Sequence, residues 1–219
     1  MKRTCIVLTV LLVLGSVAVS AWLYPRLPQQ IPTHWNLAGE VDGYGDKQWA
    51  AFLMPGIMAV LLPFLMAIPW LSPKQFKIDS FSATYWYIVL VTSLLLTYIH
   101  GLTMWAAVKG PIDITRAMLL GLVAMFGLIG RVLGRVRRNF FVGVRTPWTI
   151  ASERVWDDTH QLAARLMVGA SLLGLVLVLL PVPIPAMTTA VVGLILVAAL
   201  VPVAYSLVLY KRLERRGEL

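Results

Sequence analysis

The sequence contains little charge. Only 13% of its 219 residues are Asp, Glu, Lys or Arg, and 59% are hydrophobic. A soluble domain of ordinary composition has roughly 25% charged residues. This shortage argues against a water-soluble protein and favours a chain whose apolar side chains face lipid.

Cysteine and histidine are also scarce, and their scarcity excludes several kinds of site. The single Cys5 cannot build an intrachain disulfide framework. The only histidines are His34, His100 and His160, and no His-Glu-x-x-His segment is present. No acidic pair falls inside an apolar run. We therefore expect no metal site, no cofactor and no hydrolase activity.

Long apolar runs make up most of the chain. Six are free of charge except near their ends: 4–24, 49–71, 83–108, 114–133, 162–180 and 186–209. A helix of about 20 residues crosses the hydrocarbon core of a bilayer, and backbone groups in lipid must bond within their own segment. The runs predict an all-α, polytopic membrane helical bundle with about six transmembrane helices. The first run follows Met1-Lys2-Arg3 as a signal peptide would, but its length favours a retained helix.

The basic residues are distributed unevenly between the two sides of this topology. With the N-terminus in the cytoplasm, fifteen of the 19 Lys and Arg residues fall inside, and only Arg26, Lys47, Lys109 and Arg116 fall outside. Cytoplasmic loops of membrane proteins carry such an excess. We therefore expect both termini in the cytoplasm, the loop 25–48 outside and the loop 134–161 inside. The net charge of +9 then reflects topology, and direct nucleic-acid binding is not expected.

The inner loop predicts an amphipathic helix before the fifth span. From Ala151 onward, Val155, Trp156 and Thr159 fall on one arc at 100° per residue, with charged residues opposite. The pattern is typical of a helix lying at the membrane interface. Just before it stands a group of basic residues expected to attract anionic headgroups. These are Arg131, Arg135, Arg137 and Arg138.

The outer loop reads as a compact, turn-rich cap. Gly39 permits positive φ, and Asp42-Gly43 is a turn signal. Aromatic and polar side chains here provide a surface that an extracellular peptide could contact. The candidate ligand-binding residues of this loop are His34, Trp35, Asn36, Gly39 and Asp42.

The stretch NFFVGVRTPWTIASERVWDDTH, residues 139–160, resembles the signature of SdpI-family immunity proteins. The segment IPTHWNLAGEVDGYGDK, residues 31–47, is similar to a module of unknown function that precedes the signature in many members. One departure is Gln161, where the family pattern leads us to expect a basic residue. The resemblance implies two modules, a two-span one over 1–72 and a four-span SdpI-like one over 73–219.

The resemblance also implies a role in the bacterial cell membrane. It predicts an immunity and signalling protein that resists a secreted peptide toxin by binding toxin outside and a cytoplasmic repressor inside. The candidate partner-binding residues inside are Asn139, Gly143, Arg145, Thr146, Pro147, Trp148, Trp156 and His160.

Two other functions fit parts of the sequence. A small secondary transporter or exporter is suggested by Pro55, Pro63 and Pro69 in the second run, because broken helices line transport sites. His100 adds to this reading as the one ionisable intramembrane candidate. A non-catalytic membrane scaffold, without a ligand of its own, is the third possibility.

Overall fold

The computed structural model describes residues 2–36, 38–110 and 113–219. Its long helices are α1 (Lys2–Leu23), α3 (Leu53–Leu71), α4 (Ser82–Lys109), α5 (Ile114–Leu133), α7 (Glu153–Leu179) and α8 (Ile184–Arg216). Within the described residues, six helical segments are long and apolar enough to cross a membrane. The prediction of an all-α polytopic bundle is confirmed.

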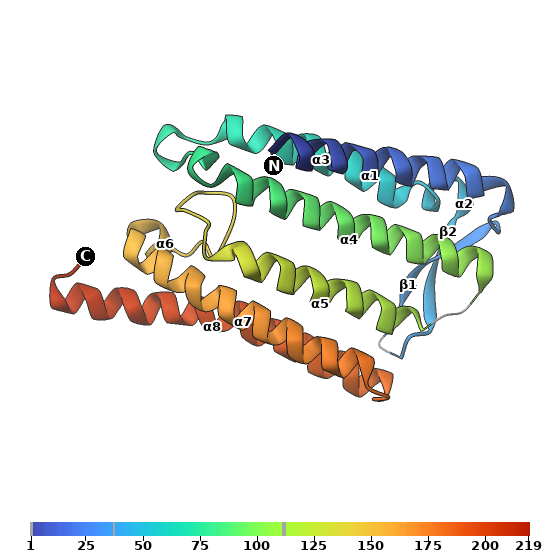
Figure 1. Ribbon diagram of the computed structural model, residues 1–219. Coiled ribbons are helices and arrows are strands. Elements are labelled where there is room, and N and C mark those ends of the chain that lie inside the picture. Colours follow the sequence, from blue (N-terminus) through green and yellow to red (C-terminus); the bar gives the residue numbers. More distant parts are fainter. Residues whose placement is uncertain (1, 37, 111–112) are drawn as a thin grey trace.

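Shorter elements connect these helices. They are the 3₁₀ turns Tyr24–Arg26, Lys74–Phe76 and Ile78–Phe81, the helices α2 (Lys47–Ala50) and α6 (Pro147–Ala151), and the strands β1 (Gln30–Trp35) and β2 (Val41–Asp46). Figure 1 shows the strands at one end of the bundle, with both chain termini toward the other end. The loop between α5 and α6 lies at the termini end. The two polar loops of the sequence therefore lie at opposite ends of the bundle.

The helices pack as two groups of three. Helix α4 packs against α1 and α3, helix α7 packs against α5 and α8, and α4 and α5 join the groups. Helices α5 and α7 approach closely because glycines face the partner helix. A Cβ built on Gly127 would lie 2.4 Å from the Ser171 Oγ atom, and one on Gly174 would lie 2.8 Å from Val123. The Ser171 hydroxyl donates to the Val123 carbonyl oxygen at 2.7 Å, which fixes this contact.

Two prolines in the second span free backbone carbonyls that other helices satisfy. Pro55 has no N–H for the Ala51 carbonyl four residues earlier, and the chain leaves regular helix between α2 and α3 at that point. The Ser20 hydroxyl of α1 donates to this carbonyl at 2.6 Å. Pro69 likewise frees the Leu65 carbonyl, which accepts from the Tyr85 hydroxyl of α4. These prolines therefore connect the second span to its neighbours.

The outer segment is a β-hairpin, which the turn-rich sequence did not reveal. Strands β1 and β2 pair antiparallel, with Gln30 opposite Asp46 and Pro32 opposite Tyr44. Irregular register around His34 bends the hairpin. On its inward side Ile31 is fully buried with Leu27, Ala50 and other apolar residues. The hairpin thus covers the helix ends of the first group.

The amphipathic segment predicted before the fifth span is helical, but it is not a separate helix. The amphipathic segment forms the first turns of α7, which continues without a break to Leu179. Its apolar arc packs against protein and not lipid, since Val155, Trp156 and Thr159 are completely buried in the bundle. The same pattern of side chains suits a protein neighbour and a membrane surface, so the period alone did not distinguish them.

Candidate functional site

Asn139 organises the loop that follows α5. Its side chain is fully buried, and its Oδ1 atom accepts from the N–H groups of Phe141 and Val142, both at 2.7 Å. Its Nδ2 atom donates to the carbonyls of Arg137 and Val142 at 2.8 and 3.0 Å. One side chain thereby satisfies four backbone groups in a segment without helix or strand partners. We call residues 134–146 the signature loop.

His160 anchors the other side of the signature loop. Its Nε2 atom accepts from the Val144 N–H at 3.0 Å, and its Nδ1 atom lies 2.8 Å from the Trp156 carbonyl oxygen. Since an amide can only donate, the proton sits on Nδ1 and the ring is neutral. Gly143 leaves room for this contact: its φ is +112°, and a Cβ there would lie 2.1 Å from Nε2. A positive φ and a close approach both favour glycine at this position.

Trp156 joins the loop to the end of α5. Its indole Nε1–H donates to the Val136 carbonyl at 2.7 Å, and its ring stacks on that of His160 with 4.1 Å between centroids. Both rings are fully buried. The indole therefore contributes a buried hydrogen bond and a large apolar surface to the same junction.

Thr146 and Pro147 begin α6. Thr146 and Thr149 form a capping box, and Pro147 occupies the first turn, where its missing N–H costs nothing. The Thr146 hydroxyl also lies 3.0 Å from the Ser206 hydroxyl of α8. This contact attaches the signature loop to the last helix. Ser206 and Thr149 were not predicted, because single hydroxyls in helical runs carry no distinctive pattern.

Half of the eight predicted partner-binding residues are inaccessible. Asn139, Thr146, Trp156 and His160 are buried, whereas Gly143, Arg145 and Pro147 are exposed and Trp148 is half-buried. The exposed side chain of Arg145 also closes the loop, because its guanidinium donates to the Phe140 carbonyl. The geometry separates residues that shape the loop from residues available to another molecule.

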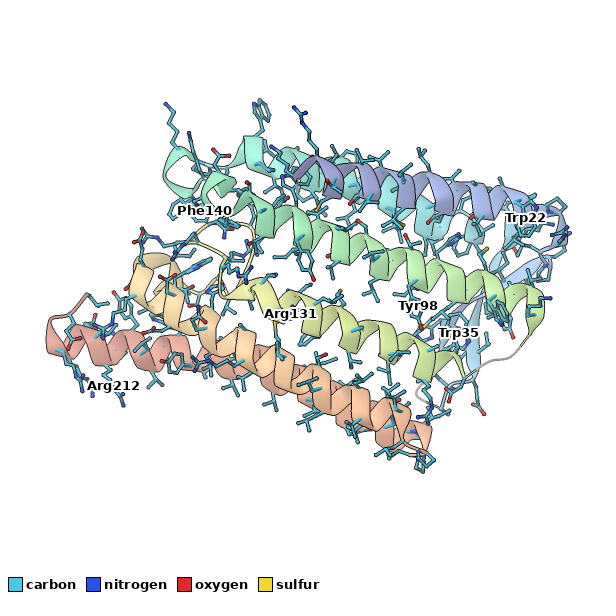
Figure 2. The ribbon with its side chains drawn as sticks, in the orientation of Figure 1. Trp22, Trp35, Tyr98, Arg131, Phe140 and Arg212 are labelled. Carbon is cyan, nitrogen blue, oxygen red and sulfur yellow. The ribbon has the colours of Figure 1, made fainter. Side chains whose placement is uncertain are left out.

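The four arginines predicted to meet lipid headgroups differ in their surroundings. Arg131, Arg135 and Arg137 are exposed, and Arg137 pairs with Asp157 at 3.3 Å. Arg138 is half-buried and donates to the Ile150 carbonyl at 3.0 Å. Figure 2 places Arg131, Phe140 and Arg212 on the termini side of the bundle. Arg131 and Arg135 are thus available to face headgroups, whereas Arg137 and Arg138 have protein partners.

At the opposite end, Asn36 closes the hairpin turn. Its Oδ1 atom accepts from the N–H groups of Ala38 and Glu40 at 2.9 and 3.0 Å. Gly39 has a φ of +85°, and a Cβ there would lie 3.1 Å from Thr115 of α5 and 3.5 Å from Ile184 of α8. The hairpin tip therefore reaches the second helix group, so the hairpin spans both groups at this end.

The exposed surface of the hairpin carries the remaining outer candidates. The Nδ1 atom of His34 lies 2.5 Å from Asp42, and their side chains are 71% and 43% exposed. Trp35 is half-buried at the end of β1, and Figure 2 shows it at the hairpin end of the bundle. Tyr44 is 59% exposed. The structure brings the predicted outer residues together on one small element.

His100 sits within a network joining three helical segments. Its Nε2 atom lies 3.2 Å from both the Ser16 carbonyl oxygen and the Ser20 hydroxyl oxygen. The Ser16 carbonyl can only accept, so Nε2 carries the proton and donates. The Ser20 hydroxyl gives its own proton to Ala51. This direction of donation does not activate Ser20 as a nucleophile, and His100 is 2% exposed. The arrangement is that of a structural bridge.

Arg116 is a further residue with a specific role that the sequence did not indicate. Its guanidinium donates to the carbonyls of Leu180 and Val182 at 2.8 and 2.9 Å and also bonds to the Val178 carbonyl. Asp113 orients it through a bond of 2.9 Å. These carbonyls lie at the C-terminus of α7 and in the turn that follows it, where helical N–H partners are lacking. Arg116 thus caps α7 from α5.

Comparison with known proteins finds similarity to two families, each over part of the chain. Residues 11–59 match a family model described as a domain of unknown function, DUF1648, and residues 135–206 match the SdpI/YfhL protein family. The chain is 26% identical over 165 residues to the protein named Immunity protein SdpI of Bacillus subtilis (strain 168). The aligned region covers 74% of this chain and 75% of that protein. No solved structure matches the chain.

The matched regions coincide with the two polar ends of the bundle. The first contains the hairpin, and the second contains nearly all of the signature loop with α6, α7 and most of α8. With both matches in this order and six helices able to span a bilayer, the chain is a multi-pass bacterial membrane protein whose residues 135–206 match the SdpI/YfhL family.

Proposed function

We propose that this protein confers immunity to a secreted peptide toxin and reports the presence of that toxin to the cell interior. The observation that carries the proposal is the pairing of two built polar surfaces at opposite ends of one bundle. The hairpin lies at one end and the signature loop at the other. The similarity to the Bacillus subtilis immunity protein supports the same reading.

In this proposal the hairpin faces outward and receives the peptide. His34 and Asp42 offer exposed polar groups, and Tyr44 offers an exposed aromatic ring. Aromatic side chains beside polar groups are typical of binding surfaces. The hairpin contacts both helix groups, so a bound peptide would act on both.

The signature loop then faces the cytoplasm and binds a partner, for which a repressor is our first candidate. Arg145 and Pro147 are exposed, and so are Arg135 and Arg137 at the start of the signature loop. Exposed basic residues of this kind favour an acidic partner surface. Asn139 and the other buried signature residues support that face without touching the partner. Catalysis has no part in the proposal.

Binding at one end must change the other end for a signal to pass. A ligand shifts only an equilibrium between states that it binds differently. Helices α5 and α8 contact the hairpin tip at their first turns, and α5 leads into the signature loop at its last turn. Ser206 of α8 also contacts Thr146 of the loop. These helices provide two direct connections between the ends.

Deletion and complementation test this function. A strain lacking the gene is challenged with the secreted peptides of competing bacteria, with the full chain or variants restored from a plasmid. We expect protection to depend on the gene, and we expect His34→Ala combined with Asp42→Ala to weaken it. A matched control is Gln30→Ala combined with Asp46→Ala, which removes another polar pair of the hairpin. Full resistance in the deletion strain would contradict the proposal.

The inner surface requires a separate readout. Arg145→Gln removes an exposed charge, and Arg212→Gln, which removes an exposed charge of α8 outside the signature loop, is the matched control. We expect Arg145→Gln to lower the amount of cytoplasmic protein that co-purifies with the membrane protein after toxin exposure, at unchanged expression. Equal capture by both variants and the unmodified chain would remove Arg145 from the partner surface.

The transporter alternative receives less support from the contacts. The carbonyls freed by Pro55 and Pro69 already accept hydrogen bonds from Ser20 and Tyr85. His100 likewise donates to neighbouring helices. Discontinuous helices in transporters present free backbone groups to their substrates. At Pro55 and Pro69, the second span uses those groups for packing.

A further inference from the structure

A cavity of about 370 Å³ lies beneath the hairpin, where the two helix groups meet. Its walls come from β1 and from α3, α4, α5 and α8, so residues far apart in the sequence form it together. Pockets that bind small ligands usually measure roughly 300–1,000 Å³. The cavity is large enough for one side chain or a small molecule.

The chemistry of the lining limits what the cavity can hold. Its apolar wall is formed by Met54, Ile99, Met118 and Leu119, and methionines adapt their shape to a ligand. Among the described residues of the lining there is no Lys, Arg, Asp or Glu. A charged group entering this space would lose its hydration without gaining a counter-charge. The occupant is therefore uncharged and mainly apolar.

One lining hydroxyl has no partner within the part of the chain that the structure describes. Thr188, the fifth residue of α8, is 7% exposed, and its Oγ1 atom makes no hydrogen bond there. The hydroxyl of Thr103, in the same lining, differs because it donates to the Ile99 carbonyl at 3.0 Å. Buried polar atoms are nearly always bonded, so an orphan hydroxyl beside a cavity indicates a missing partner.

The edge of the cavity favours a peptide over a lipid chain. His34 and Asn36 contribute to the lining, and the His34 side chain is also largely exposed, which places it at the opening. Polar groups at an opening can pair with the amides that flank a peptide side chain. An acyl chain offers no such groups.

We propose that this cavity binds an aromatic side chain of a peptide that carries one polar atom, such as tryptophan or tyrosine. The ring occupies the apolar space, and its N–H or O–H group bonds to the Thr188 hydroxyl. This inference rests on the proposed function, because it identifies the part of the toxin that the hairpin end recognises.

Equilibrium dialysis of two capped tripeptides tests the site directly. The full chain in phosphatidylcholine nanodiscs is mixed with tritiated acetyl-Ala-Trp-Ala-amide or acetyl-Ala-Phe-Ala-amide, with empty nanodiscs as the blank. We expect one saturable site for the tryptophan peptide and weaker binding of the phenylalanine peptide, whose ring has no polar atom. Loss of one hydrogen bond corresponds to roughly a three- to ten-fold change in Kd.

Two matched variants separate the hydrogen bond from general packing. Thr188→Val should weaken the tryptophan peptide by that factor and leave the phenylalanine peptide unchanged. Thr103→Val makes the same chemical change in the same cavity, but its hydroxyl is already bonded, so the expected change is less than two-fold. Equal weakening by both variants, or equal effects on both peptides, would overturn the assignment.

A lipid occupant gives a different result. Phosphatidylcholine with a diazirine at the end of its acyl chain should label the exposed groove of α3 around Val60 more strongly than Met118. Preferential labelling of Met118 would replace the peptide with an acyl chain and overturn the proposal. Survival of cells under toxin is measured separately with Thr188→Phe, whose larger side chain fills the cavity. If the unmodified chain binds the tryptophan peptide saturably but Thr188→Phe cells survive as well as before, the site is supported and the proposed function is contradicted.

Discussion

Replacing Tyr85 with phenylalanine should destabilise the protein by removing one hydrogen bond. The Tyr85 hydroxyl is the donor that reaches the Leu65 carbonyl, and Pro69 cannot supply the usual helical N–H. Tyr85 is 1% exposed, so water has no easy access to the orphaned carbonyl. An unsatisfied buried group costs about 1–3 kcal/mol. For a chain of this length, about 2 kcal/mol corresponds to a fall in Tm of roughly 4–8 °C.

The single native thiol provides the assay. Cys5 is buried in α1, so its reaction with a thiol-reactive fluorophore during heating reports unfolding in detergent. Adding Pro69→Ala should restore most of the loss in Tyr85→Phe, because alanine at that position brings back the helical N–H for the Leu65 carbonyl. The reasoning is refuted if Tyr85→Phe melts with the unmodified chain, or if the double variant melts no higher than Tyr85→Phe.

Tyr98 supplies the matched control for this substitution. Its hydroxyl donates to the Ala117 carbonyl at 2.9 Å. That carbonyl lies inside α5, where the amide of Gly121 also donates to it. Tyr98→Phe therefore leaves no carbonyl without a partner. We expect its Tm to fall by less than half as much as that of Tyr85→Phe.

Three further results are expected. Gly143→Ala forces a positive φ on alanine and a clash with the buried ring of His160, so it should lower the free energy of unfolding by about 2–4 kcal/mol in a thermal melt. The control is Gly169→Ala, which should not lower it, because the space around a Cβ there is open. Arg116→Gln removes the cap of α7 and should cost about 2 kcal/mol by chemical denaturation in detergent. In a cysteine-free background, a membrane-impermeant maleimide should label Asp42→Cys in intact cells and Arg145→Cys only after permeabilisation; the reverse order would invert the topology.

The sequence predicted the helices well because each apolar run has the length and composition of a membrane-spanning helix. The second run was predicted over 49–71, and α2 and α3 occupy 47–71 with a short break. Separation of the two polar loops followed from the number of crossings between them. Sidedness, the division of the chain at residue 72 and the binding roles of individual residues stay predictions, to be tested as described above.

The local interactions of the site could not be predicted because they join residues distant in sequence. Ser20 reaches Ala51, Arg116 reaches Leu180, and each involves a backbone carbonyl that any residue type possesses. The amphipathic pattern around Trp156 was real, but an apolar arc does not say whether lipid or protein covers it. The most recognisable residues of the signature proved to be those that hold the loop in shape.

The unbroken course of α7 gives the bundle a mechanical property. Its 27 residues form a rod about 40 Å long at 1.5 Å per residue. If such a rod pivots by about 5° around its centre, each end moves by roughly 1.7 Å, which is within the 1–2 Å helix shifts of known switches. The Trp156–His160 pair lies at one end of this helix, and His160 bonds to Val144, the residue before Arg145. A small tilt that begins on the far side of the membrane would therefore be enough to move Arg145.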